Sequence, residues 1–149
     1  MTFSILDAIG NTPLVAIKRL NPNPSVRILA KLEYMNPGGS IKDRVALAMI
    51  EAGERSGELT PQKIVLEATS GNTGIGIALT AAVKGYKTLF VVTDKVSDEK
   101  INYLKALGGE VIVVSNAVEP DHPQYYVNVA KRIHQETPNS IFAYQYSNP

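Results

Sequence analysis

Hydrophobic and polar positions follow two different patterns along this chain. Residues 40–57, 72–85, 97–109 and 123–136 are typical of helices, the first with apolar side chains at helical spacing. Short apolar runs of strand length occupy residues 63–68, 88–92, 110–114 and 141–146, and residues 26–33 alternate well enough to form another strand. Because strands and helices take turns from residue 63 onward, the pattern predicts a three-layer α/β fold, with a mainly parallel, twisted sheet and helices on both faces.

The ends of the predicted helices carry start and stop signals. Ser40 and Asp43 have the spacing of a capping box, and Gly57 is suited to end the helix that they begin. Ser97 is a good N-cap for the third helix. Pro123 occupies a first-turn position of the fourth helix, where proline is well tolerated.

In a sheet of this kind, ligands bind beyond the carboxyl ends of the strands. The sequence therefore directs attention to the segments that follow the predicted strands, which are residues 68–72, 93–97, 115–122 and 145–149.

The first of these segments has the composition of an anion site. In the stretch EATSGNTGIG, residues 67–76, a strand runs into a helix start whose backbone N–H groups face the ligand side. Thr69, Ser70 and Thr73 add hydroxyl groups. A glycine-rich helix start that merely packs on its sheet is the alternative explanation, and the sequence alone leaves it open.

The glycines narrow the choice of ligand. Gly71 permits unusual backbone angles, whereas Gly74 and Gly76 stand inside the helix, where each costs about 1 kcal/mol relative to alanine. We therefore expect another group to approach the helix backbone closely at these two glycines. Their order differs from the dinucleotide fingerprint and from the phosphate loop, so a small anion such as a carboxylate is favoured over a nucleotide.

Lys42 is the second chemical feature. It lies in NPGGSIKDR, residues 36–44, within the first turn of a predicted helix, where a cation costs roughly 0.3–1 kcal/mol relative to an acid. A solvated lysine is one explanation. The other is an amine made available for chemistry, because positive potential and burial both lower the pKa of a lysine.

Composition and charge exclude several classes of protein. The chain of 149 residues fits one compact domain, and its net charge of +1 gives no electrostatic footprint for nucleic acid or an anionic membrane. Without cysteine there are no disulfides or thiolate metal sites, and His122 and His134 lack a metal-type spacing, so no metal is expected. No signal peptide or membrane span is evident, which makes the cytoplasm the expected compartment.

Four motifs together resemble the cysteine synthase and cystathionine β-synthase family. They are GNTPLV (10–15), KLEYMNPGGSIKDR (31–44), EATSGNTGIGIA (67–78) and YQYSNP (144–149), in the order and at the spacing of the family. The family consists of pyridoxal-phosphate enzymes of fold type II, the type shared with tryptophan synthase β chains. The resemblance covers essentially the whole chain, but only the amino-terminal portion of the family's polypeptide.

The resemblance implies a role for each matching position. Lys42 matches the lysine that bonds covalently to pyridoxal 5'-phosphate and then acts as the catalytic base. Asn72 matches the asparagine that hydrogen-bonds the ring hydroxyl of the cofactor. The remaining matches grip the substrate α-carboxylate, and they are Thr69, Ser70, Gly71, Thr73 and Gln145.

The implied reaction is β-replacement, in which an O-activated serine and sulfide give cysteine. Condensation of serine with homocysteine, as in cystathionine β-synthases, is the alternative. A protein of another class, a truncated and catalytically incomplete folded module, also stays open, and the glycine order disfavours a nucleotide-binding domain. The substrate would be a small amino acid, and neither nucleic acid nor membrane is an expected partner.

The resemblance also implies a division of the chain. Residues 1–37 would be an amino-terminal arm that belongs to a larger second domain, and residues 38–149 would form the smaller, substrate-binding domain. The family's loop for the cofactor phosphate would lie beyond residue 149, so we expect a longer polypeptide, homodimeric when full length. For the same reason, this chain alone is expected to bind the cofactor poorly.

Overall fold

The computed structural model describes residues 3–69 and 71–145. Its regular elements follow the predicted alternation of strands and helices, after an amino-terminal segment that holds two further short strands. The strands are β1 (Leu14–Ala16), β2 (Leu29–Lys31), β3 (Ile64–Ala68), β4 (Lys87–Thr93), β5 (Glu110–Val114) and β6 (Ser140–Phe142). The helices are α1 (Lys42–Ser56), α2 (Asn72–Lys84), α3 (Asp98–Ala106) and α4 (Tyr126–Glu136), with short 3₁₀ helices at Ile5–Ala8 and Glu33–Met35.

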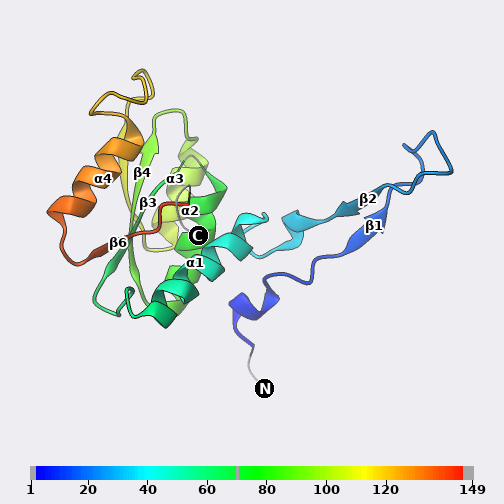
Figure 1. The fold of residues 1–149 in the computed structure, drawn as a ribbon, viewed down its shortest axis with the longest axis horizontal. Helices are drawn as coiled ribbons and strands as arrows, with labels where there is room; N and C mark the ends of the chain where they lie inside the picture. Colours follow the sequence, from blue (N-terminus) through cyan, green and yellow to red (C-terminus); the bar gives the residue numbers. More distant parts are fainter. Residues whose placement is uncertain (1–2, 70, 146–149) are drawn as a thin grey trace.

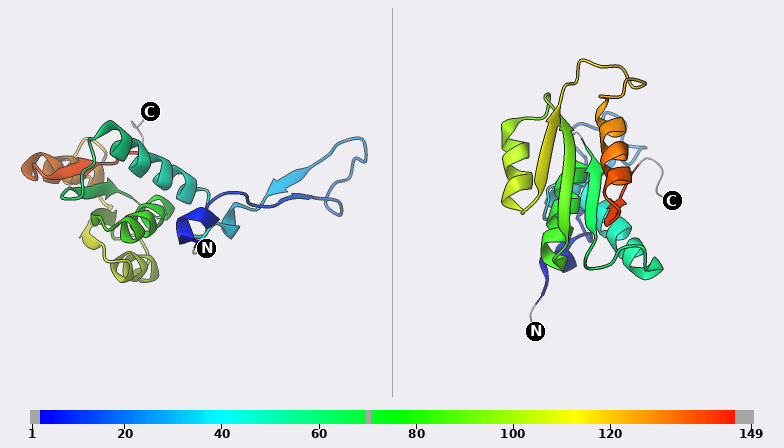
Figure 2. Two further views of the ribbon diagram at one scale, coloured as in Figure 1. Left: turned by 90° about the horizontal axis from the view of Figure 1, so that it is seen from below. Right: turned by 90° about the vertical axis from the view of Figure 1, so that its left-hand side faces the viewer.

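Within the described residues, the main sheet has the strand order β5-β4-β3-β6, and every neighbouring pair is parallel. The register pairs Leu66 with Leu89 on one side and with Phe142 on the other. Helices α1, α2 and α3 cover one face of the sheet and α4 covers the other (Figures 1 and 2). The predicted three-layer α/β fold is therefore confirmed.

Two apolar cores separate these layers because successive side chains of a strand point to opposite faces. Val65 packs toward α1 and α2, among Ile77 and Phe90, whereas Leu66 packs toward α4, among Val91 and Val129. This double burial explains why the central strands β3 and β4 appear as largely apolar runs rather than as alternating ones.

The connections place a topological switch point between β3 and β6. From β3 the chain steps outward through α2, β4, α3 and β5 on one face. Helix α4 then returns across the other face, and β6 pairs beside β3. Ligand crevices in open α/β sheets form at such points, beyond the carboxyl ends of the two strands.

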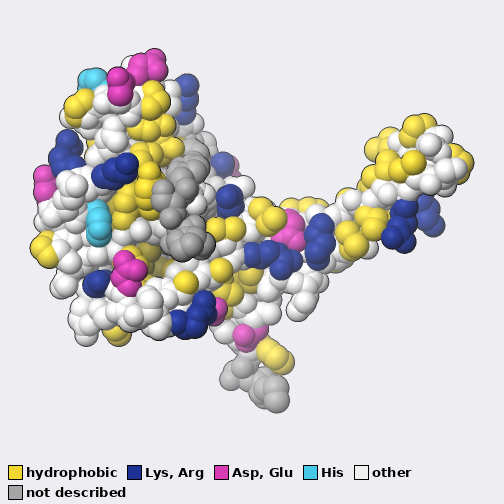
Figure 3. Space-filling view, in the orientation of Figure 1, with side chains coloured by type: hydrophobic (Ala, Val, Ile, Leu, Met, Phe, Trp, Pro, Cys, Tyr) yellow, Lys and Arg dark blue, Asp and Glu magenta, His cyan; other side chains and the backbone are white. Residues whose placement is uncertain are grey.

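The amino-terminal segment projects away from this sheet (Figure 1). Strands β1 and β2 form an antiparallel pair with Val15 opposite Ala30, and Leu14 and Leu29 of this pair are exposed. Figure 3 shows apolar side chains along the projecting segment. The predicted strand at 26–33 is shorter in the structure. None of the helices in residues 3–69 and 71–145 is long and apolar enough to cross a membrane.

Two predicted boundaries were wrong. Helix α4 begins at Tyr126, after a turn in which the Gln124 N–H donates to His122 Nδ1 at 3.0 Å, so Pro123 precedes the helix. Strand β6 ends at Phe142 rather than 146, and Tyr144 has a left-handed φ of 41°.

The predicted capping box at the start of α1 was also wrong. The Asp43 carboxylate accepts from the Gly38 N–H at 2.5 Å instead of from Ser40. Ser40 Oγ accepts from the Lys42 N–H at 3.1 Å. Burial raises the pKa of Asp43, whereas the hydrogen bond from Gly38 lowers it. Asp43 thus fixes the glycine turn that leads into α1.

Candidate active site

Lys42 is the first residue of α1, and close packing of α1 on α2 sets its position. A Cβ added at Gly76 of α2 would lie 2.9 Å from the Lys42 carbonyl oxygen and 3.0 Å from Ala46 Cβ. A Cβ at Gly74 would lie 2.6 Å from Thr69 Cγ2. The close approach expected at these two glycines is therefore made by the protein itself, and the glycines hold Lys42 against the start of α2.

The turn after β3 is organised by Thr69. Its Oγ1 accepts hydrogen bonds from the N–H groups of Gly71 and Gly74, each at 3.2 Å. Thr69 is only 2% exposed, so its hydroxyl serves mainly to shape the turn. Thr73 follows in the first turn of α2, where backbone N–H groups have no intrahelical partner. Ser70 lies outside the described residues.

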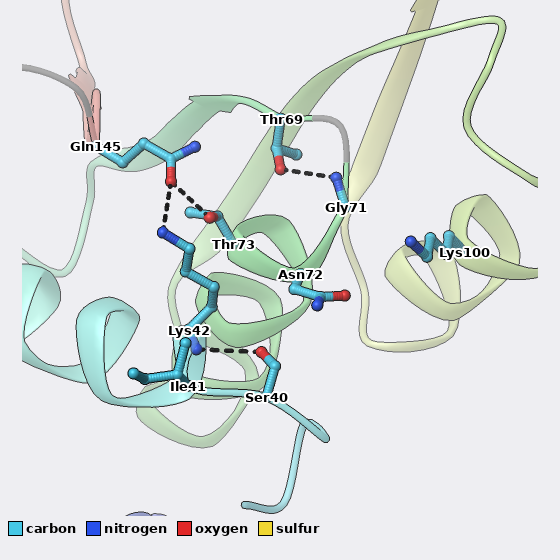
Figure 4. Close-up of a pocket in the computed structure, with 9 residues that line it drawn as sticks. All are labelled: Ser40, Ile41, Lys42, Thr69, Gly71, Asn72, Thr73, Lys100 and Gln145. Atoms are coloured by element: carbon cyan, nitrogen blue, oxygen red, sulfur yellow. Dashed lines mark hydrogen bonds between the residues drawn. The ribbon is translucent and has the colours of Figure 1, made fainter. Parts of the chain in front are cut away.

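Gln145 joins Lys42 to this turn. Its Oε1 accepts from Thr73 Oγ1 at 2.7 Å and from Lys42 Nζ at 3.4 Å (Figure 4). Three segments that are far apart in sequence meet here because β6 returns beside β3. The expected proximity of the Lys42 amine to the 69–73 turn is thus present in the structure.

A cavity of about 440 Å³ lies between these groups. Besides Lys42, Gln145 and the turn, its walls include Ser40, Ile41, Asn72 and Lys100, and the Asn72 amide points away from the α2 axis beside it (Figure 4). Lys100 was not predicted as a site residue. It stands in the first turn of α3, directly after residues 93–97, a segment that was singled out from the sequence because it follows a predicted strand. That position in the chain was the signal by which Lys100 could have been found.

The cavity suits an anion. Among the described residues that line it, Lys42 and Lys100 carry positive charge and none is acidic. Hydroxyl and amide groups and the start of α2 add hydrogen-bond donors. No group of three or more acidic or histidine side chains in the described part of the chain is placed to hold a metal ion.

A second polar cluster ties the amino-terminal segment to α1. Arg44 grips the Glu33 carboxylate through Nε at 2.8 Å and Nη2 at 3.0 Å, and Thr12 Oγ1 donates to the same carboxylate. The Arg44 guanidinium, with help from Thr12, lowers the pKa of Glu33 to about 2. Because Arg44 stands two residues after Lys42, this cluster fixes the start of the helix that carries the amine.

An α/β domain that presents a lysine amine and a donor-rich turn at its switch point has the arrangement of a binding site for a small anionic ligand. The chain belongs to the family of pyridoxal-phosphate dependent enzymes, whose sequence model matches residues 5–149. The expected α/β fold of this family is also found in solved relatives. One is the O-acetylserine dependent cystathionine beta-synthase of Helicobacter pylori, with a TM-score of 0.90 and 36% identity, covering 100% of this chain and 48% of that one.

Curated relatives of known name are consistent with this family assignment. Cystathionine beta-synthase of Saccharomyces cerevisiae is 47% identical over 148 residues, which are 97% of this chain and 29% of the relative. A probable cysteine synthase of Bacillus subtilis is 42% identical over 142 residues, 95% of this chain and 45% of the relative. The chain thus spans less than half the length of each.

The residues present fit the family's cofactor. Lys42 supplies a primary amine, the group that condenses with an aldehyde, and it opens on a cavity without acidic side chains among its described lining. The Asn72 amide, a group able to hydrogen-bond a ring substituent, lines the same cavity (Figure 4). The predicted positions therefore come together as one site, except for Ser70, which the structure does not describe.

Proposed function

We propose that the full-length protein carries out pyridoxal-phosphate dependent β-replacement, using sulfide to convert an O-activated serine into cysteine. The observation that carries the proposal is the convergence of the Lys42 amine, the Gln145 amide and the Thr73 hydroxyl on one anion-suited cavity. Membership of the family and the cysteine synthase relative support it.

In this proposal each side chain has a distinct task. Thr73, Gln145 and the turn at Gly71 hold the substrate α-carboxylate, which fixes the direction of the α-C–H bond. Lys42 takes the α-proton, the leaving group departs from the β-carbon, a sulfur nucleophile adds there, and Lys42 returns the proton. Bound pyridoxal phosphate would supply an electron sink for the negative charge at the α-carbon. Lys42 and Asn72 would hold that cofactor.

Homocysteine is the second candidate nucleophile, with serine as its partner. The names of two relatives favour it, because the Saccharomyces and Helicobacter proteins are both cystathionine beta-synthases. The Helicobacter protein is also described as O-acetylserine dependent, which keeps an O-activated serine in view as the first substrate.

We also propose that residues 1–37 pack against a larger second domain and that residues 38–149 form the smaller substrate-binding domain of a homodimer. The exposed apolar side chains of the projecting β1–β2 pair, such as Leu14 and Leu29, support this division. The cytoplasm remains the expected compartment.

Covalent labelling tests the site without requiring turnover. The protein is mixed with pyridoxal phosphate, reduced with borohydride and digested, and the labelled peptides are identified by mass. We expect the label on Lys42, and its loss in Lys42→Ala. Lys100→Ala is the matched control, since it removes the other amine of the cavity. A label spread equally over surface lysines would contradict the assignment and favour a folded, catalytically incomplete module.

Product analysis then decides the nucleophile. O-acetylserine with sulfide is compared with serine and homocysteine, using the protein loaded with cofactor. Cysteine as the main product supports the first proposal, and cystathionine supports the second. Absence of both products from a protein that carries label on Lys42 would refute β-replacement while leaving the cofactor site intact.

A further inference from the structure

Glu67 is an acidic side chain buried within strand β3. None of its surface is exposed, and neither carboxyl oxygen forms a well-aligned hydrogen bond with a described residue, although the backbone N–H groups of Tyr144 and Gln145 lie near enough to stabilise its charge. By strand alternation it faces the same side as Val65, toward α1 and α2. A buried carboxylate without well-aligned hydrogen bonds is costly, so its presence in an otherwise apolar strand requires a reason.

The groups around Glu67 come from the active site. Burial raises the pKa of Glu67 to about 7, while the nearby N–H groups of Tyr144 and Gln145 and the positive charge of Lys42 lower it. Strand β4 places apolar Phe90 opposite Glu67 in the register. Among the described residues, Lys42 of α1 is the charged group whose field acts on this carboxyl.

The turn above Glu67 has a strained backbone. Tyr144 has a φ of 41°, a left-handed conformation that non-glycine residues rarely adopt. Successive N–H groups in a turn of this kind form a concave site for an anion. The same turn carries Gln145, whose Oε1 accepts from Thr73 and Lys42, so the position of the turn determines where that oxygen lies.

We propose that Glu67 is a positioning residue, whose ionised carboxylate draws the Tyr144 and Gln145 N–H groups inward and so places the Gln145 side chain against Thr73 and Lys42. Both carboxyl oxygens lack well-aligned hydrogen bonds with described residues, so ionisation of Glu67 would favour a better alignment of the Tyr144 and Gln145 N–H groups. The roles of Lys42 and Gln145 in catalysis rest on the proposed function. The interaction of the Glu67 carboxylate with the Tyr144 and Gln145 N–H groups does not.

The test follows amide signals of the ¹⁵N-labelled chain by NMR as pH is raised, without cofactor or substrate. We expect the backbone amides of Tyr144 and Gln145, and the Gln145 side-chain amide, to shift with one shared midpoint near pH 7, the pKa of Glu67. Glu67→Gln should abolish this shift. Glu54→Gln is the control, because Glu54 lies near the other end of α1 and pairs with Lys84 of α2. This substitution should leave the shift of the Tyr144 and Gln145 amides unchanged.

The outcomes are separable. Amides that do not titrate near pH 7, or that still do so in Glu67→Gln, would overturn the proposal. If Glu67→Gln does not fold, Glu67→Asp serves instead, because its shorter side chain withdraws the carboxylate from the turn. A smaller shift then supports positioning and an undiminished shift refutes it. If the Tyr144 and Gln145 amides titrate together in a protein that fails the labelling test, the positioning role of Glu67 is supported and the proposed function is rejected.

Discussion

The burial of Glu67 predicts an unusual dependence of stability on pH. Folding raises the pKa of this carboxyl from 4.5 to about 7. Between these values the folded chain binds more protons than the unfolded chain, so the contribution of Glu67 to the free energy of unfolding falls as pH rises. Since one pH unit corresponds to about 1.4 kcal/mol, ionising Glu67 costs the fold about 3 kcal/mol by the time pH exceeds 7.

Glu67→Gln isolates this cost. The amide has nearly the same shape and does not ionise, so any packing penalty that it introduces stays constant with pH. We expect the difference in unfolding free energy between the two proteins to move by about 3 kcal/mol in favour of the variant between pH 4.5 and pH 8. Urea unfolding followed by circular dichroism at a series of pH values measures that difference.

Glu54→Gln provides a control of opposite sign. The Lys84 ammonium, bonded at 2.8 Å, lowers the pKa of Glu54, so the stability from this pair is present at neutral pH and is lost as pH falls. The difference curve of this variant should therefore favour the wild type as pH rises. A flat curve for Glu67→Gln, or one with the slope of the Glu54 control, would refute the burial argument.

Three further predictions concern the packing and charges around the site. Gly76→Ala should reduce the unfolding free energy by about 1–2 kcal/mol in urea titrations, because overpacking against the Lys42 carbonyl outweighs the better helix propensity of alanine. Lys42→Met should shift the pH-dependent loss of stability to higher pH, since it removes the positive charge that lowers the pKa of Glu67. Glu33→Gln should increase hydrogen exchange at the start of α1 at neutral pH, where the wild-type Glu33 carboxylate, with a pKa of about 2, is paired with Arg44; unchanged exchange would show that the pair is dispensable.

Local sequence signals were enough to locate two walls of the site. Lys42 and the Thr69–Thr73 turn were found because helix starts and strand ends can be recognised within a few residues. The alternation of strands and helices then predicted the parallel sheet. Strand β1 was missed, because three exposed residues that pair only with β2 carry no periodic pattern of their own.

Contacts over long sequence distances required more than local patterns. Gln145 reaches Lys42 across 103 residues, and only the return of β6 beside β3 brings them together, so this residue was identified through a family motif. Lys100 was missed because a helix-start lysine on a charged surface helix looks ordinary. Glu67 was counted as part of an apolar strand, since periodicity shows neither which face of a strand is buried nor what lies against it.

The two costliest features near the cavity lie together, and this argues that they serve one purpose. A chain optimised for stability alone would replace Glu67 with a neutral residue and would relax the left-handed backbone of Tyr144. Strain of this kind persists where the surrounding structure and the chemistry of a site require it. The difference in unfolding free energy between Glu67→Gln and the wild type should therefore move in favour of the variant as pH rises from 4.5 to above 7. The same variant should hold the Gln145 side chain less firmly. A variant that gained stability and whose Gln145 amide signals still matched those of the wild type at every pH, titration included, would separate the two features and remove the functional reason for the buried acid.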